Sequence, residues 1–173
     1  TLFEEQALGE EVMRQSGTEI IRIAKQLEGA LFKKTTKAMH EAKKIYVAGA
    51  GASLIAVQWL QFTLNMLRPN VELVKMETSS LIRTLQEIEE SDLVIIISLH
   101  RYYNEPLQLA EEILSRGAAV IGITDSAIAP IRQLTHQCFV LEQTELSTID
   151  LMPALITFLN ALVVGMMSHD ASY

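Results

Sequence analysis

Two glycines and a serine, Gly49, Gly51 and Ser53, stand where a short apolar segment ends and a helical pattern begins. A turn this tight favours glycine, because one backbone position takes a positive φ and another must let a ligand approach the main chain. The first amides of a helix have no acceptor within the helix and favour an anion. The pattern predicts an anion-binding turn to which Ser53 adds a hydroxyl, or else a connecting turn in which Ser53 caps the helix.

A second polar group, Ser98, His100 and Arg101, follows the most apolar segment of the chain. The planar guanidinium of Arg101 can hold a phosphate or a carboxylate, and His100 can donate a further hydrogen bond. In this interpretation the ligand lies over this segment and the glycine turn. Alternatively, Arg101 is a solvated charge paired with Glu105 or Glu145.

Other polar side chains are further candidates. Ser79 follows the second predicted strand and either caps a helix or adds a hydroxyl to the site. Glu145 follows the last predicted strand, where it accepts hydroxyl groups of a polyol, shuttles a proton or lies solvated in a loop. We expect Tyr102 and Tyr103 to cover the edge of the sheet or pack on a partner rather than stack on a ligand.

The sequence argues against metal and dinucleotide sites. His40 and His136 have no second ligand at metal-binding spacing. A dinucleotide fold would need a third glycine, which residues 54–57 do not contain, and an acidic residue at the end of the second strand, where Val74 and Lys75 stand. We therefore expect no cofactor.

Composition limits the class of protein. The chain has 173 residues, of which 49% are hydrophobic, and this suits one domain with its own core. The net charge of -7 argues against direct binding to DNA, because the phosphate backbone attracts clustered lysine and arginine. A single cysteine, Cys138, excludes an internal disulfide and fits a reducing cytoplasm. The first residue is Thr1, so we expect the chain to begin inside a longer protein.

Helical and apolar patterns alternate along the chain. An apolar stripe from Ile20 to Leu31 and a helical segment before residue 44 predict a helical extension over residues 1–43, which we expect to brace a partner subunit or a preceding domain. In residues 44–173, helical patterns separate five apolar segments, at 45–48, 71–74, 93–98, 118–124 and 138–141. This alternation predicts an α/β fold, a three-layer, doubly wound, five-stranded parallel sheet. The candidate residues all follow strands, and we expect them at one edge of that sheet.

The last helical segment, from Leu151 to Met167, is apolar on nearly every side. It contains Pro153 and Asn160 and is short for a membrane span, so we expect no membrane partner. A helix of this kind needs a cover on every side, and a second subunit is the expected cover. The chain is therefore predicted to form a homodimer or a dimer of dimers.

Three segments of the chain keep the order and spacing of a known family. Residues 48–53 read Ala-Gly-Ala-Gly-Ala-Ser, residues 92–98 are an apolar strand that ends in serine, and residues 117–125 are another strand, followed by Pro130 and Leu134. Together they resemble the sugar isomerase (SIS) domain. The helical lead-in and the Glu145-x-Ser147 entry to the last helix are most similar to the effector domain of RpiR-type bacterial transcription regulators. The resemblance implies a sugar phosphate or sugar acid as ligand, and DNA binding through an N-terminal helix-turn-helix domain outside this sequence.

One segment departs from the family pattern. The family's phosphate loop reads Ser-x-Ser-Gly-x-Thr, whereas residues 98–103 read Ser-Leu-His-Arg-Tyr-Tyr, so only Ser98 matches. A backbone nest for phosphate is therefore not expected in its usual shape. Two functions stay open. The first is an effector-binding domain, not an enzyme, in which the ligand shifts a dimer between two arrangements. The second is a ketose–aldose sugar-phosphate isomerase that uses Glu145 and His100 as proton-transfer groups.

Overall fold

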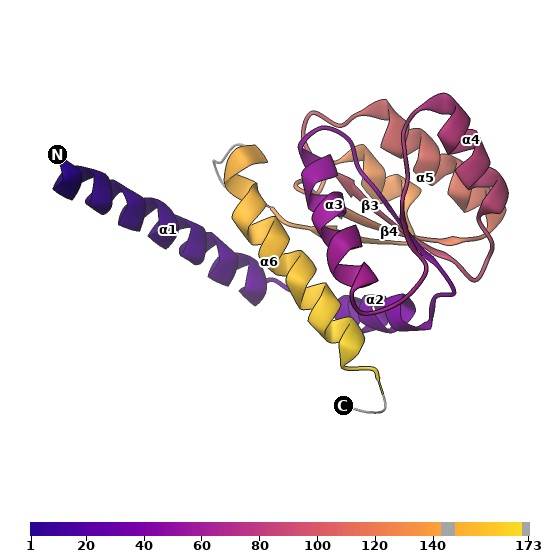
Figure 1. The fold of residues 1–173 in the computed structure, drawn as a ribbon, viewed down its shortest axis with the longest axis horizontal. Helices are drawn as coiled ribbons and strands as arrows, with labels where there is room; N and C mark the ends of the chain where they lie inside the picture. The colour runs from indigo at the N-terminus through magenta and orange to yellow at the C-terminus, as the bar shows by residue number, and fades with distance from the viewer. Residues whose placement is uncertain (143–147, 171–173) are drawn as a thin grey trace.

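In residues 1–142 and 148–170, which the computed structural model describes, five parallel strands lie between two layers of helices (Figure 1). The elements in chain order are α1 (Leu2–Lys25), α2 (Gly29–Glu41), β1 (Ile45–Ala48), α3 (Ala52–Asn65), β2 (Val71–Leu73), α4 (Thr78–Glu87), β3 (Leu93–Ser98), α5 (Asn104–Arg116), β4 (Ala119–Thr124), the 3-10 helix η1 (Pro130–Leu134), β5 (Gln137–Val140) and α6 (Thr148–Met167).

The strands pair in the order β2-β1-β3-β4-β5, and every pair is parallel. The chain therefore moves outward from β1 to β2 and then returns to β3 on the other side of β1. The strand order reverses between β1 and β3, and doubly wound sheets bind ligands at the carboxyl ends of the strands beside such a reversal. The predicted α/β class, with a doubly wound parallel sheet, is confirmed.

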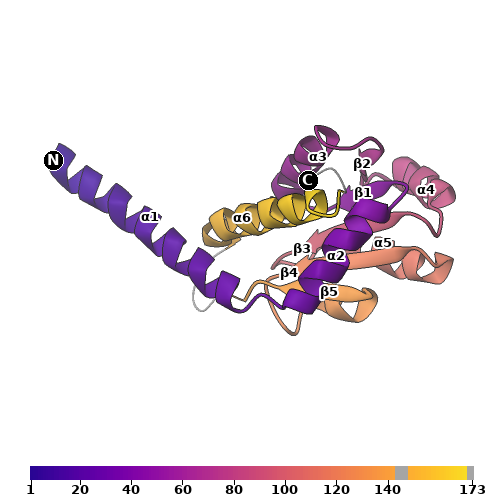
Figure 2. The same ribbon diagram turned by 90° about the horizontal axis from the view of Figure 1, so that it is seen from below.

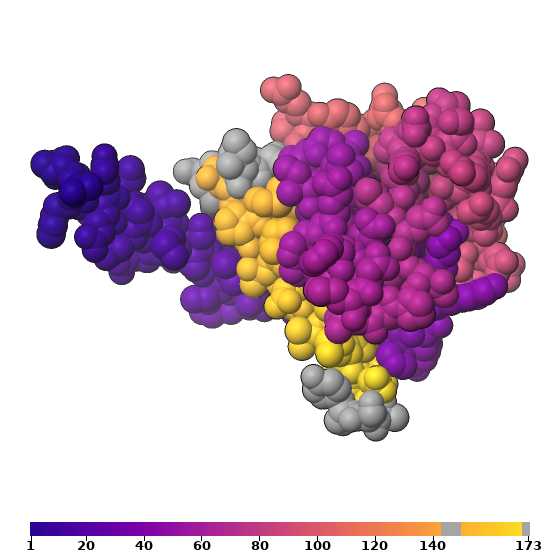
Figure 3. All heavy atoms as spheres, in the orientation of Figure 1, coloured from indigo at the N-terminus to yellow at the C-terminus, as the bar shows by residue number. Residues whose placement is uncertain are grey.

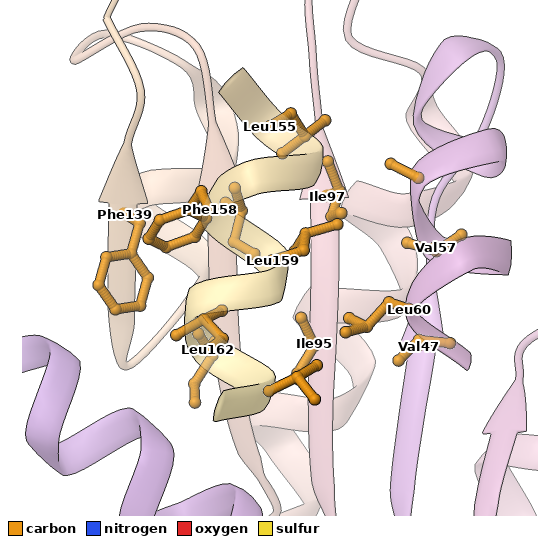
Figure 4. Close-up of a cluster of buried hydrophobic side chains, with 14 of the residues drawn as sticks. Val47, Val57, Leu60, Ile95, Ile97, Phe139, Leu155, Phe158, Leu159 and Leu162 are labelled. Carbon is orange, nitrogen blue, oxygen red and sulfur yellow. The ribbon is translucent and has the colours of Figure 1, made fainter. Parts of the chain in front are cut away.

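The central strand β3 explains why the sheet needs two helical layers. All of its residues are buried, and alternate side chains enter separate apolar clusters. Ile95 and Ile97 pack under α3 and α6 (Figure 4), whereas Val94 and Ile96 pack against α5 on the opposite face. Helices cover both faces of β3, which accounts for the unbroken apolar sequence of residues 93–97 before Ser98 at its end.

Helix α6 is covered mainly by its own chain. It packs against α1, α2 and α3, and Figure 2 shows it lying over the sheet. Leu159 is fully buried, whereas Val164 is 57% exposed on the outer side. By length and composition α6 is apolar enough to span a membrane, but here it is a core helix. The apolar faces of α6 were expected to be covered by a second subunit, and helices of the same chain cover most of them instead, because apolar periodicity does not say which element supplies the cover.

The N-terminal segment contains two helices where a continuous stripe was predicted. The chain leaves the helical path at Gln26 and Leu27, whose amides bond to the carbonyls of Ile23 and Ala24 at 3.1 and 3.3 Å. The bend lets α2 pack against α6, while the beginning of α1 extends away from the sheet (Figure 3). The expected N-terminal helical extension is present, with apolar side chains exposed along it.

Candidate functional site

The glycine turn after β1 has the backbone that its sequence predicted. Gly51 is the N-cap of α3 and has φ 61° and ψ -131°, a conformation that residues with a Cβ rarely adopt. Gly49 is needed for a different reason than ligand approach. A Cβ on Gly49 would lie 2.9 Å from the Cβ of Ser53, so the small residue lets the first turn of α3 pack against the end of β1.

The amides at the start of α3 are only partly used. The amide of Ser53 donates to the carbonyl of Ala50 at 3.2 Å, and the amide of Leu54 donates to that of Gly51 at 3.1 Å. In the described part of the chain, the amides of Gly51 and Ala52 have no hydrogen-bond acceptor. The alternative in which Ser53 caps α3 is wrong, because Gly51 is the cap and Ser53 lies buried in the first turn.

Ser98 brings a second polar group to this turn. It is the last residue of β3, and the register that pairs Ala48 with Ile96 places it beside the chain that follows β1. Its hydroxyl is buried and, among the described residues, lacks a hydrogen-bond partner, whereas its carbonyl accepts a 2.7 Å bond from Thr124. A buried hydroxyl without a partner is costly in a folded protein, so Ser98 is a candidate for a hydrogen bond with a water or with a bound molecule.

Asp125 organises the segment after Ser98. Its carboxylate accepts the amide of His100 at 3.0 Å and the hydroxyl of Tyr102 at 2.8 Å. Burial, together with the hydrogen bond to Asp125, raises the pKa of Tyr102 to about 12. The ring of His100 stands edge-on to that of Tyr102, with centroids 5.8 Å apart. Asp125 was missed as a site residue, although its place directly after β4, at the same edge of the sheet, was a usable signal.

Tyr103 lies on the glycine turn. A Cβ on Gly51 would be 2.6 Å from Cε2 of Tyr103 and 2.9 Å from its Oη, so the ring occupies the space that a side chain at Gly51 would take. The tyrosine is 49% exposed, and within the described residues its hydroxyl has no hydrogen-bond partner. It was expected at the sheet edge or on a partner, and the structure places it over the turn.

Arg101 is exposed and forms no ion pair with Glu105 or any other described residue. Glu145, its other expected partner and a candidate site residue in its own right, lies outside the described residues. Arg101 is therefore an exposed cation, three residues after Ser98 in the chain, whose charge no described carboxylate neutralises.

The last candidates lie apart from these contacts. Ser79 is exposed in the first turn of α4, whose N-cap is Glu77, so the prediction that Ser79 caps this helix was wrong. His136 accepts the amide of Val120 at its Nδ1, a bond that extends the strand pairing. Within residues 1–142 and 148–170, no group of three or more histidine, cysteine or acidic side chains is placed to hold a metal ion.

Comparisons with known proteins agree with the fold. The family model for the SIS domain matches residues 38–167. No curated protein matches the sequence.

Three solved structures are similar over most of the chain. The sugar isomerase domain of an RpiR transcription factor from Sphaerobacter thermophilus has a TM-score of 0.86 and 21% identity, covering 95% of this chain and 92% of that one. The Vibrio vulnificus NanR protein complexed with ManNAc-6P has a TM-score of 0.84 and 16% identity, covering 96% and 64%. A Methanococcus jannaschii protein with an inferred function of 3-hexulose-6-phosphate isomerase has a TM-score of 0.76 and 18% identity, covering 94% of both chains.

Proposed function

The chain belongs to the SIS domain family, and on this basis we propose that it is the effector-binding domain of an RpiR-type transcription regulator. The proposed effector is a sugar phosphate or a related acidic sugar, bound at the carboxyl ends of β1 and β3. The observation that carries the proposal is the buried hydroxyl of Ser98, which has no partner in the described part of the chain and belongs to the strand end beside the turn that begins α3. The similarity to an RpiR domain and to a NanR complex with a sugar phosphate supports the choice of ligand class.

The proposed site combines three kinds of donor. The amides of Gly51 and Ala52 have no acceptor and the hydroxyl of Ser98 has no partner among the residues that the structure describes, and Arg101 supplies a positive charge. The amino end of a helix favours an anion, and a guanidinium strengthens the hydrogen bonds that it donates to one. Together these groups suit a compact polar molecule with one acidic group.

An isomerase is the second candidate, because one similar structure has an inferred isomerase function. Isomerisation needs a base close to a carbon-bound proton and a group that protonates the neighbouring oxygen. The backbone of His100 is held by Asp125, and the loop 98–103 keeps only Ser98 of the family's phosphate pattern. This favours binding without turnover, and turnover of a ketose phosphate in a coupled assay would reverse that preference.

Replacing Ser53 with aspartate should abolish effector binding, because a carboxylate at the start of α3 repels an anion. A thermal-shift screen of sugar phosphates, sugar acids and amino sugars identifies the probe, since a ligand at about a hundred times its Kd adds about 2.7 kcal/mol of stability. Ser79→Asp, which adds the same charge to the exposed start of α4, should still bind. Because Ser53 is buried, Ser98→Ala, which removes the hydroxyl that lacks a partner among the described residues, serves as a second variant, with an expected loss of about tenfold. Wild-type affinity in both Ser53→Asp and Ser98→Ala, by calorimetry, would refute the site.

We further propose that residues 1–43 form a dimerisation segment, that the assembly is cytoplasmic, and that DNA is bound through a separate domain. Leu8 and Val12 lie one helical turn apart on α1 and are 65% and 54% exposed. Burying them against a second copy removes apolar surface from water, which is the main force in association. Light scattering at micromolar concentration should therefore give twice the 19.3 kDa mass of the chain.

The double variant Leu8→Glu/Val12→Glu should be monomeric in the same measurement. Ile128→Glu, which alters an apolar residue that is 92% exposed in the loop after β4, should leave the dimer intact. A monomeric wild type, or a double variant that remains dimeric, would contradict the assignment of α1 to the dimer interface.

A further inference from the structure

An internal carboxylate already occupies the donors of the loop after β3. The two oxygens of Asp125 accept the amide of His100 and the hydroxyl of Tyr102 at 3.0 and 2.8 Å. A backbone amide and a hydroxyl are the donors with which a loop of this kind would wrap a phosphate. Neither is left for a ligand, and the charge of Asp125 repels a second anion placed against the same groups.

The other anion position is partly filled by Tyr103. Its ring lies where a Cβ on Gly51 would be, at 2.6 Å from Cε2, and so it covers the turn that presents the first amides of α3. The family pattern has a threonine at this slot, which is far smaller. A bulky tetrahedral group therefore has less room above the turn than the glycines alone would leave.

The donors that remain suit a smaller and less charged group. Besides the amides of Gly51 and Ala52, which Tyr103 partly covers, the site has the guanidinium of Arg101, exposed and unpaired among the described residues, and the hydroxyl of Ser98. A carboxylate is also planar, carries one negative charge, and fits the fork of a guanidinium with two parallel hydrogen bonds. A phosphate monoester carries about -1.5 to -2 charges and three acceptor oxygens, and it needs more donors than these.

We propose that Asp125 and Tyr103 exclude phosphate from this site and that the effector is a sugar acid whose carboxylate is held by Arg101. This inference rests on the proposed function and chooses between its two ligand classes. Tyr103 acts as a specificity-determining residue by its size. Asp125 is a positioning residue, because it acts through the amide of His100 and the hydroxyl of Tyr102.

The test uses pairs of sugars that differ only in the acidic group. Glucuronate and glucose 6-phosphate share one ring, as do galacturonate and galactose 6-phosphate, and calorimetry on the wild type gives the affinity ratio within each pair. We expect at least one uronate to bind tenfold or more tightly than its phosphate counterpart. The variants Tyr103→Thr and Asp125→Asn should each reduce that ratio, and the double variant should reduce it at least tenfold.

The variants separate size from charge. Tyr103→Phe keeps the ring over Gly51 and should keep the wild-type ratio, whereas Asp125→Asn keeps an acceptor for His100 and removes the charge. A merely structural role for either residue would weaken both members of a pair equally and leave the ratio unchanged. Circular dichroism establishes that each variant is folded. The affinity ratio of the wild type tests the preference for a carboxylate even if a variant does not fold.

Each outcome bears on a different claim. Wild-type preference for a phosphate, with binding lost in Ser53→Asp, overturns the exclusion of phosphate and leaves the proposed effector site standing. An unchanged ratio in folded Tyr103→Thr and Asp125→Asn overturns the roles of these residues. If no sugar acid or sugar phosphate binds the wild type, the effector site fails, and the inference fails with it.

Discussion

Leu159→Ala should destabilise the protein by about 3 kcal/mol, because it removes a fully buried side chain from the centre of the core. Leu159 lies on the face of α6 that is turned to the sheet, in the cluster that contains Ile95 and Ile97 of β3 (Figure 4). The loss combines the transfer of apolar surface with the cavity left behind. Denaturant unfolding followed by circular dichroism measures it as a lower midpoint at constant slope.

The matched control lies on the same helix. Val164 of α6 is 57% exposed, and Val164→Ala should change stability by less than about 0.5 kcal/mol. If Val164→Ala costs as much as Leu159→Ala, α6 is covered from outside in solution, as a subunit interface at this face would require. A loss below about 1 kcal/mol for Leu159→Ala would contradict the placement of α6 in the core.

The strands and helices around β3 were predictable because local signals agree there. Residues 93–97 form an unbroken apolar run in β3, and residues 104–116 form a helix that ends at Gly117, which has φ 85°. Glycine in this left-handed conformation commonly ends a helix. The helical periodicity and Gly117 therefore indicate the same carboxyl end for this helix. The predicted bounds of the strand at residues 93–98 match those of β3 for this reason.

Contacts between distant segments were not predictable in the same way. The break between α1 and α2 at Gln26 depends on where α6 lies, and one apolar stripe fits a bent pair of helices as well as a straight one. The helix caps were also not predictable from residue type. Ser53 and Ser79 have cap-forming side chains but lie inside the first turns of their helices. The type of a side chain shows whether it can cap a helix, but the position at which the helix begins can differ by one or two residues.

Half of the candidate site followed from the sequence. The positive φ at Gly51 and the place of Ser98 at the end of β3 came from turn chemistry and strand pattern. Tyr103 and Asp125 depend on pairings across the sheet edge that no local pattern encodes. Residues 100–103 depart from the family's phosphate-loop pattern, and at such positions the structure gives contacts that the sequence does not.

Gly51→Ala should both destabilise the domain and weaken effector binding, because one methyl group creates two conflicts. The backbone at φ 61° and ψ -131° costs about 1–3 kcal/mol for a residue with a Cβ. The new Cβ would also stand 2.6 Å from Cε2 of Tyr103, so the ring must move off the turn. Thermal unfolding and calorimetry with the probe found for the wild type measure the two effects.

Two control variants separate these conflicts. Gly9→Ala adds a methyl group to α1, where no other atom lies within 4 Å, and should be neutral or stabilising. Adding Tyr103→Ala to Gly51→Ala removes the clash and keeps the backbone strain, so the double variant should lose less stability than the sum of the single losses. Simple additivity would mean that the ring does not lie on Gly51. Wild-type stability in Gly51→Ala would mean that the turn does not need the left-handed conformation, and the anion-binding geometry built on that turn would then be wrong.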